Sequence, residues 1–450
     1  MMRFSKRSRF IALIGIGVAI ALLSCPLSIA QPAPRSATTL NPTTLKQTLD
    51  QGNINEAVQQ IELGWKTQYE TYYQRKMTGQ LFLADQIRSV LGRNAFLTKQ
   101  RSALIYAVPT STSLELIVIT ADGQPIHRRV SEANQKTLKA AIAEFRENAV
   151  NIERDPEDYL PPAQKLYQLM MQPIESELQA RNITNLIFCM GADLRSTPLA
   201  AMHDGQRFLS EKYSIAIIPA FSLLNQRPAT LRNTRVLAMG ASQFRDMQPL
   251  QEVPRELEVI AQNLWQGQKL LNQEFTIDRL RAERSKFPYG IIHLATHAAF
   301  SPGEADDSFI QFWDQRLQLT QLPGLNLRSP EVQLLVLSAC QTALGDRQAE
   351  LGFAGLAVQS GSQAAIASLW KADDTGTLVL MTEFYRQLRT APSKAEALRR
   401  AQSALLKQQT RTAINLATRG NSNSATDNLV STNLSHPYYW AAFTLIGNPW

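Results

Sequence analysis

Two apolar segments, residues 291–297 (IIHLATH) and Leu334–Thr342 (LLVLSACQT), decide the fold that this chain is expected to adopt. Each segment reads as a buried strand with a histidine or a cysteine where the apolar character stops. In an open parallel sheet, ligands and chemistry collect at the carboxyl ends of the strands, so we expect His297 and Cys340 to meet at one sheet edge. A thiolate beside an imidazole forms a nucleophile and its base, and the protonated imidazole lowers the pKa of the thiol.

Outward from these segments, strand-like and helix-like stretches alternate along the chain. Strands are predicted at 185–190, 213–219, 235–240, 290–295, 332–338, 364–370 and 438–446, and helices at 132–146, 163–181, 255–264, 276–285, 353–360, 375–389 and 394–412. This alternation predicts an α/β fold with a mainly parallel sheet covered on both faces by helices. Before it, β-branched runs at 103–108 and 114–120 flank a polar turn and predict a hairpin.

The region before the hairpin is expected to be helical. Apolar residues recur at helical spacing over 45–76, with a break at Gly52-Asn53. The two predicted helices resemble a single tetratricopeptide hairpin, which cannot form a solenoid because repeat arrays need about three or more copies. We therefore expect a helical packing element or a site for a protein partner. A polar, turn-rich stretch at 419–435 is expected to be a surface loop.

The first 30 residues resemble an export signal. Residues 1–10 carry four basic side chains and no acidic one, 11–23 are apolar, and the small residues at 28–30 (SIA) suit cleavage. Two alternatives compete with a cleaved signal. The sequence LLSC at 22–25 resembles a lipoprotein box in which Cys25 would be acylated, and residues 10–30 are long enough for an uncleaved membrane anchor. Each alternative places the rest of the chain outside the cytoplasm, with membrane contact only through this segment.

Composition limits the classes of function. A chain of 450 residues with 44% hydrophobic and 19% charged residues is ordinary for a globular protein with a substantial core. The net charge of +8 falls to about +4 without the first 30 residues, which is too mild and too scattered to indicate nucleic-acid binding. Besides Cys25, only Cys189 and Cys340 remain, and a lone pair is not a disulfide framework even though a bond between them is formally possible. Cys189 lies in an apolar run and is expected to be buried.

The histidines and cysteines also fit structural roles. Cys340 and His297 also suit a buried cysteine and a hydrogen-bonded structural histidine. His293 lies four residues before His297, so strand alternation would direct both rings to the same face. A zinc pair at that spacing is expected on a helix and not on a strand, so core packing is the better role for His293. The sequence contains no phosphate-binding loop, no serine nucleophile elbow and no His-Glu-x-x-His motif, and we expect no cofactor and no metal.

The residues around both segments resemble the CHAT domain, a caspase-like domain associated with tetratricopeptide repeats. The resemblance rests on HLATHAAF at 293–300, LVLSACQTALG at 335–345, ELGFAGLA at 350–357, ASLW at 367–370, HPYYWAAF at 436–443 and, upstream, STPLAAMHDG at 196–205. It implies a caspase-type α/β/α sandwich and a cysteine endopeptidase acting on a protein or peptide substrate, with Cys340 as nucleophile and His297 as general base and acid. The expected organisation is then a signal or anchor at 1–30, a linker at 31–43, a helical region at 44–100, a hairpin and helix at 101–159 and the CHAT domain at 160–450.

The resemblance also implies an oxyanion hole made by the backbone N–H groups of Ala298 and Cys340. The family typically has glycine where this chain has Ala298. If the backbone there requires a positive φ, the methyl group costs about 1–2 kcal/mol and misdirects the donor. Alanine at this position therefore keeps open an alternative function, a caspase-fold module that binds peptides with little or no turnover.

Substrate-binding residues are expected near the ends of other strands. By resemblance to caspases, the strand ending at Ser368 pairs with an extended substrate and Trp370 lines a pocket, although core packing is an equal role for Trp370. Asp193 and Asp373, with Asp374, offer negative charge for a basic side chain before the cleaved bond. Their alternative roles are a turn residue for Asp193 and a helix N-cap for the pair, where Asp374 is the favoured cap.

Overall fold

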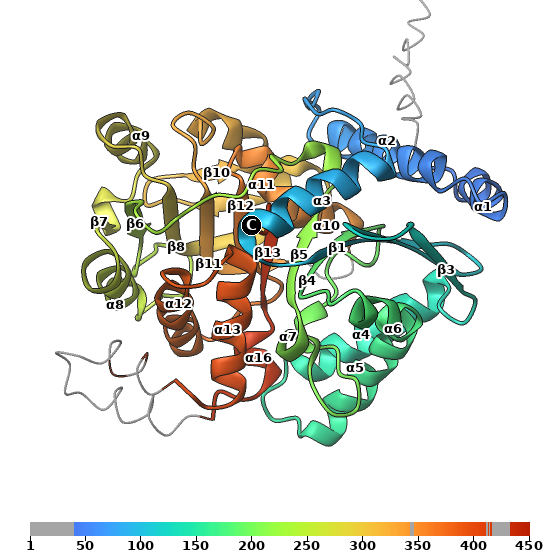
Figure 1. Cartoon of the computed structure of the whole chain (residues 1–450). Helices are drawn as coiled ribbons and strands as arrows, with labels where there is room; N and C mark the ends of the chain where they lie inside the picture. Colours follow the sequence, from blue (N-terminus) through green and yellow to red (C-terminus); the bar gives the residue numbers. More distant parts are fainter. Residues whose placement is uncertain (1–39, 343–345, 411–412, 414, 416–432) are drawn as a thin grey trace, which may run out of the picture. The chain divides into compact units, whose positions relative to one another are not determined.

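One mixed sheet runs through the part of the chain that the computed structural model describes, residues 40–342, 346–410, 413, 415 and 433–450 (Figure 1). The strand order is β10-β9-β8-β11-β12-β13-β5-β4-β1-β2-β3, and β6 pairs with both β8 and β7. The strands are β1 Ser102–Pro109, β2 Leu114–Thr120, β3 Ile126–Val130, β4 Asn185–Met190, β5 Ser214–Ile218, β6 Val236–Gly240, β7 Gly267–Leu271, β8 Ile291–Phe300, β9 Phe309–Gln311, β10 Arg316–Gln318, β11 Leu334–Thr342, β12 Ala364–Ser368 and β13 Phe443–Gly447.

Helices cover both faces of this sheet, so the predicted α/β class is confirmed. They are α1 Pro42–Asp50, α2 Ile54–Tyr72, α3 Ala84–Thr98, α4 Gln135–Ala149, α5 Pro156–Met170, α6 Gln172–Ala180, α7 Leu209–Lys212, α8 Val253–Glu258, α9 Ile277–Lys286, α10 Arg347–Ala354, α11 Leu356–Ser360, α12 Asp374–Leu388, α13 Lys394–Leu406 and α16 Pro437–Trp440. Near the strands that carry His297 and Cys340, α8 and α12 pack on one face of the sheet and α10 and α11 on the other.

The sheet consists of two parallel blocks that run in opposite directions. In the first block β7, β6, β8, β11 and β12 are parallel, and in the second β13, β5, β4 and β1 are parallel. The blocks meet where β12 and β13 pair antiparallel, with Ser368 opposite Phe443. The strands β8 and β11 therefore share a carboxyl edge, near which His297 and Cys340 lie, whereas Asp193 beyond β4 belongs to the block that runs in the opposite direction.

Alternation along β1 explains how this strand is buried on both faces. Ile105 and Ala107 lie in a core shared with α4 to α6, whereas Leu104 and Tyr106 lie in a second core shared with α1 to α3. Full burial of such a side chain contributes roughly 1.5–3 kcal/mol. The predicted hairpin of β1 and β2 is confirmed, and a third strand, β3, extends it.

The N-terminal helices begin where asparagine side chains cap them. Asn41 accepts hydrogen bonds from the first turn of α1, and Asn53 caps α2 directly after the predicted break. On α2, the fully buried carboxylate of Glu62 accepts hydrogen bonds from the Tyr106 hydroxyl at 2.7 Å and from the backbone N–H groups of Phe221 and Ser222 at 2.9 and 2.8 Å. These helices are thus a packing element of the whole fold.

Several predicted boundaries were wrong, each for a local reason. β8 and β11 extend past the predicted ends at 295 and 338, because β9 pairs with the last part of β8 and β11 continues beside it. The aromatic run at 438–446 divides into the helix α16 and the strand β13. The predicted helix at 394–412 ends at Leu406, and most of the predicted loop at 419–435 lies outside the described residues.

Candidate active site

His297 and Cys340 lie on neighbouring parallel strands, as predicted. In the pairing of β8 with β11, His297 is opposite Ala339 and Ala298 is opposite Cys340. The spacing of adjacent strands and the rise per residue place the Cα atoms of such diagonal neighbours about 6 Å apart. The topology therefore places the two positions on neighbouring strands, one residue out of register, and both lie within their strands and not beyond them. In a regular sheet such an offset puts the two side chains on opposite faces.

A β-bulge separates His297 from His293. The register of β8 against β11 shifts between Leu337 and Ala339, so the regular alternation of side chains is interrupted there. The prediction that both rings share one face was wrong, because the bulge interrupts the alternation between His293 and His297. The two rings accordingly have different surroundings. His293 is fully buried, with Nε2 3.0 Å from a carboxylate oxygen of Glu256 and Nδ1 3.1 Å from the Tyr385 hydroxyl. Its predicted role in core packing is confirmed.

The ring of His297 is oriented by the loop that follows β6. Its Nε2 lies 2.7 Å from the backbone carbonyl oxygen of Gln248. A carbonyl oxygen only accepts hydrogen bonds, so this contact holds the proton on Nε2 and leaves Nδ1 with the free lone pair of a base. The Phe244 ring packs on the imidazole with the ring centroids 4.6 Å apart. Burial, aided by the charge of Lys371, lowers the pKa of His297, whereas the bond to Gln248 opposes this shift.

The loop that holds His297 begins at a glycine. A side chain at Gly240 would place its Cβ 2.4 Å from the Ala295 carbonyl oxygen and 2.9 Å from Val253, so only glycine allows β6 to approach β8 this closely. The pairing of β6 with β8 ends at Gly240 and Ala295, and β9 pairs with β8 from Ala298 onward. His297 thus lies where one neighbouring strand ends and the next begins.

Ala298 adopts a negative φ, since it is absent from the positive-φ residues of the described chain. Its methyl group therefore causes no left-handed strain, and the predicted cost does not apply in this conformation. Ala298 has a partner strand on each side, Cys340 of β11 and Ile310 of β9. Because backbone N–H groups lie in the plane of a sheet, its N–H is directed at a neighbouring strand in this conformation.

A cavity of about 420 Å³ lies beside His297. It is lined by Phe244, Arg245, Asp246 and Met247 of the loop after β6, and by Gln311, Trp313, Asp314, Gln315 and Arg316 of β9, β10 and their turn. Phe244 contacts both this cavity and the His297 ring. Neither these residues nor Gln248 are predicted from the sequence. The backbone carbonyl of Gln248 has no sequence signal, and Trp313 was not distinguishable from a core aromatic.

Two of the predicted substrate-binding residues lie in the packed interior. Ser368 is the last residue of β12 and is fully buried, and its backbone is opposite Phe443. The Trp370 ring is 5% exposed, and its Nε1 donates to the Tyr438 carbonyl oxygen at 3.1 Å. In this structure Trp370 therefore packs in the core and does not line a pocket for substrate.

The predicted acidic residues are engaged by partners within the chain. The Asp193 carboxylate pairs with Arg347 at 2.8 Å and accepts from Gln135 at 2.6 Å, and the Arg347 and Gln135 hydrogen bonds lower its pKa against the opposing effect of burial. Its φ of +69° fits the alternative turn role. Asp373 is the N-cap of α12 and accepts from the Gly376 N–H at 2.7 Å, so the assignment of this cap to Asp374 was wrong. Asp374 instead accepts from the Glu252 N–H at 2.9 Å.

Cys189 is buried and carries a free thiol, and burial raises the pKa of this thiol well above its usual range. Among the residues that the structure describes, no three His, Cys, Asp or Glu side chains converge as a metal site. Across the same residues, none of the helices combines the length and apolar character needed to cross a membrane.

Comparison with known proteins defines the class of this chain. The model of the CHAT domain family matches residues 160–448, nearly two thirds of the chain. This chain belongs to the CHAT domain family, and the caspase-like α/β fold that the resemblance implied is confirmed.

No curated protein sequence matches significantly. Among solved structures, the crystal structure of the Saccharomyces cerevisiae separase–securin complex contains a chain that matches with a TM-score of 0.48 at 10% identity. The match covers 90% of this chain and 34% of that chain, so this chain spans about a third of the other's length.

Proposed function

We propose that this chain is a cysteine endopeptidase in which Cys340 is the nucleophile and His297 the general base and acid. The observations that carry the proposal are that His297 and Cys340 lie one residue out of register on adjacent strands and that Gln248 fixes the imidazole tautomer. Because a one-residue offset normally places side chains on opposite faces of a sheet, catalysis requires this end of β11 to leave the register seen here. In this tautomer Nδ1 accepts the thiol proton, the thiolate attacks the scissile carbonyl carbon, and the imidazolium then protonates the leaving amine.

The cavity beside His297 supplies a place for the polypeptide next to the scissile bond. Its two aromatic rings, Phe244 and Trp313, offer apolar contact, and its acidic and basic side chains offer ion pairs. Asp193 and Asp373 do not contribute to the proposal because their carboxylates already have partners. Export also belongs to the proposal, and it rests on the charge and apolar pattern of residues 1–30.

A second candidate function is a peptide-binding module with little turnover. The specific observation in its favour is that Ala298 is paired on both sides, by Cys340 and by Ile310. An oxyanion cannot bind an N–H that faces a neighbouring strand, and the loss of one oxyanion donor costs roughly 10²–10³ in turnover. Under the peptidase proposal, substrate binding must free the Ala298 N–H from the neighbouring strand that it faces.

A positional peptide library tests the two candidates directly. The peptidase proposal predicts cleavage by the full chain, loss of cleavage in Cys340→Ala and His297→Ala, and retained cleavage in Cys189→Ala, which removes the thiol outside the site. The same library reports the residue preferred before the cleaved bond. If peptides bind to the wild type and to Cys340→Ala equally and none is cut, the binding module is correct and the peptidase proposal fails.

A further inference from the structure

A second cavity lies at the other end of the strands that carry the site. It has a volume of about 350 Å³ and is lined by the α2–α3 connector, the segment after β5 and the segments directly before β11 and β12. Because it adjoins the amino ends of β11 and β12, it is separate from the His297 and Cys340 positions near the carboxyl end of β11. Its size is at the lower end of the range for small-molecule sites, which suits a metabolite and not a folded partner.

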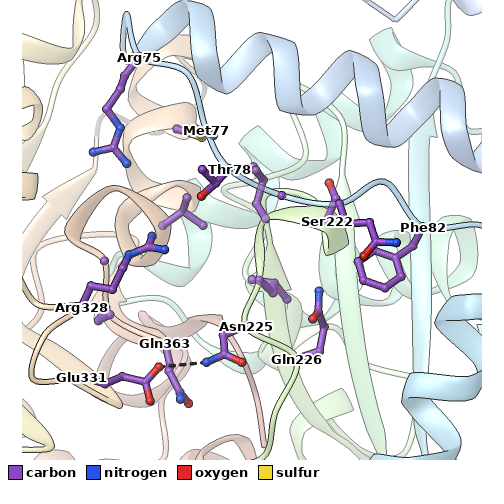
Figure 2. Close-up of a pocket in the computed structure, with 17 residues that line it drawn as sticks. Arg75, Met77, Thr78, Phe82, Ser222, Asn225, Gln226, Arg328, Glu331 and Gln363 are labelled. Carbon is purple, nitrogen blue, oxygen red and sulfur yellow. Dashed lines mark hydrogen bonds between the residues drawn. The ribbon is translucent and has the colours of Figure 1, made fainter.

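Two arginines meet at this cavity without neutralising partners. Arg75 of the connector and Arg328 before β11 both line it, and Figure 2 shows their guanidinium groups on the same side of the cavity. Neither side chain has a hydrogen-bond or ion-pair partner among the described residues. The one acid in the lining, Glu331, is engaged by the Asn225 amide at 3.0 Å. Both residues are exposed, so solvent screens the repulsion between their charges, but their guanidinium groups remain free to donate charge-assisted hydrogen bonds to an anion between them.

The cavity wall also contains buried polar atoms that lack partners. Ser222 is 3% exposed and Gln363 is 8% exposed, and within the described chain neither the Ser222 hydroxyl nor the Gln363 side-chain carbonyl has a hydrogen-bond partner. Buried polar atoms are normally paired, so atoms of this kind in a cavity wall indicate a ligand or bound water. The Gln363 oxygen accepts a hydrogen bond, which points to a ligand with a neutral donor as well as a negative charge.

At this cavity the α2–α3 connector packs closely against the segment that follows β5. A Cβ at Gly79 of the connector would lie 2.3 Å from the Ser222 carbonyl oxygen, so only glycine lets the connector approach this segment. The connector is thereby held against the domain core with Arg75 at the cavity.

We propose that this cavity binds a small oxyanionic ligand, bearing a phosphate or carboxylate group and a neutral hydrogen-bond donor, between Arg75 and Arg328 with contacts to Ser222 and Gln363. The site is independent of peptide cleavage. Its ligand would bridge the N-terminal helices and the strands of the CHAT domain.

Binding of inorganic phosphate, pyrophosphate and succinate to the full chain tests this site, with sodium chloride at matched ionic strength as the reference. We expect saturable binding by calorimetry, together with thermal stabilisation, for the phosphate probes or for the dicarboxylate, and the comparison identifies the anionic group. Arg75→Gln and Arg328→Gln should each raise the dissociation constant about tenfold.

Arg93→Gln is the matched control, because this exposed arginine on α3 makes the same change in charge away from the cavity. It should leave the dissociation constant unchanged. The proposal is overturned if no probe binds saturably, if both cavity variants bind as the wild type does, or if Arg93→Gln weakens binding equally.

Discussion

The imidazole Nε2 of His297 lies 2.7 Å from the backbone carbonyl oxygen of Gln248, and the Gln248 side chain in turn accepts a hydrogen bond from Lys371 at 2.7 Å. This second hydrogen bond links the loop after β6 to the loop after β12 next to His297. The contact with the Gln248 carbonyl oxygen assigns the proton to Nε2 and makes Nδ1 the basic nitrogen of the proposed site. Lys371 acts on His297 both through its hydrogen bond to the Gln248 side chain and through its charge.

Replacing Lys371 by methionine should raise the pKa of His297. Lys371 lowers this pKa through charge repulsion, which is a smaller cause than burial, so removing the charge leaves burial as the main lowering effect. An NMR titration of the His297 ring measures the change. Lys136→Met, an exposed lysine on α4, is the control and should leave the pKa of His297 unaltered. An unchanged or lower His297 pKa in Lys371→Met would show that Lys371 does not act on this ring.

Glu62→Ala should destabilise the whole fold by roughly 3 kcal/mol or more. The substitution leaves three buried donors, the Tyr106 hydroxyl and the N–H groups of Phe221 and Ser222, without their acceptor, and each unsatisfied group costs about 1–3 kcal/mol. Denaturant unfolding measures the change. Gln59→Ala on the exposed side of α2 should stay within about 0.5 kcal/mol of the wild type. Equal effects of the two substitutions would refute the role given to Glu62.

The free energy of unfolding of Asp374→Asn, relative to that of the wild type, should be higher above pH 6 than below pH 4. Burial first, and then the neighbouring carboxylates Glu256, Glu252 and Asp373, raise the pKa of Asp374 to about 6 from an ordinary 3.8. Between these values the folded state holds more protons than the unfolded state, so the free energy of unfolding falls as the pH rises through this window. The two-unit difference corresponds to at most about 3 kcal/mol.

Asparagine at 374 keeps an acceptor for the Glu252 N–H and removes the charge, so the variant should lose this dependence on pH. The measurement is denaturant unfolding of the wild type and the variant at pH 4 and pH 7. Parallel curves for the two proteins would contradict the raised pKa.

Sequence patterns predicted the strands and the placement of His297 and Cys340 on neighbouring strands because both follow from local chemistry. Apolar runs mark β8 and β11, and the order of motifs around His297 and Cys340 indicated the CHAT domain. The caps were less predictable, because adjacent aspartates at 373 and 374 compete for one position and tertiary contact with Glu252 decides between them.

What the sequence did not predict depends on contacts between distant segments. The Gln248 carbonyl is a backbone group that any residue supplies, and its position depends on where the loop after β6 leaves the sheet. The extension of β8 to Phe300 depends on pairing with β9, a strand of three residues with little pattern of its own. Asp193 looked available next to β4, but Arg347, more than 150 residues later, neutralises it.

The central claim is that His297 activates Cys340, and the rate of Cys340 alkylation by iodoacetamide as a function of pH tests it most directly. Mass spectrometry of the labelled peptides follows Cys340 and Cys189 separately, and Cys189 should stay unreactive because it is buried. We predict that Cys340 in the wild type reacts at a rate already near its plateau at pH 7, and that His297→Ala slows this rate about tenfold or more. Cys340 rates that are equal in both proteins, and that rise only toward the ordinary thiol range near pH 8.5, would contradict the claim.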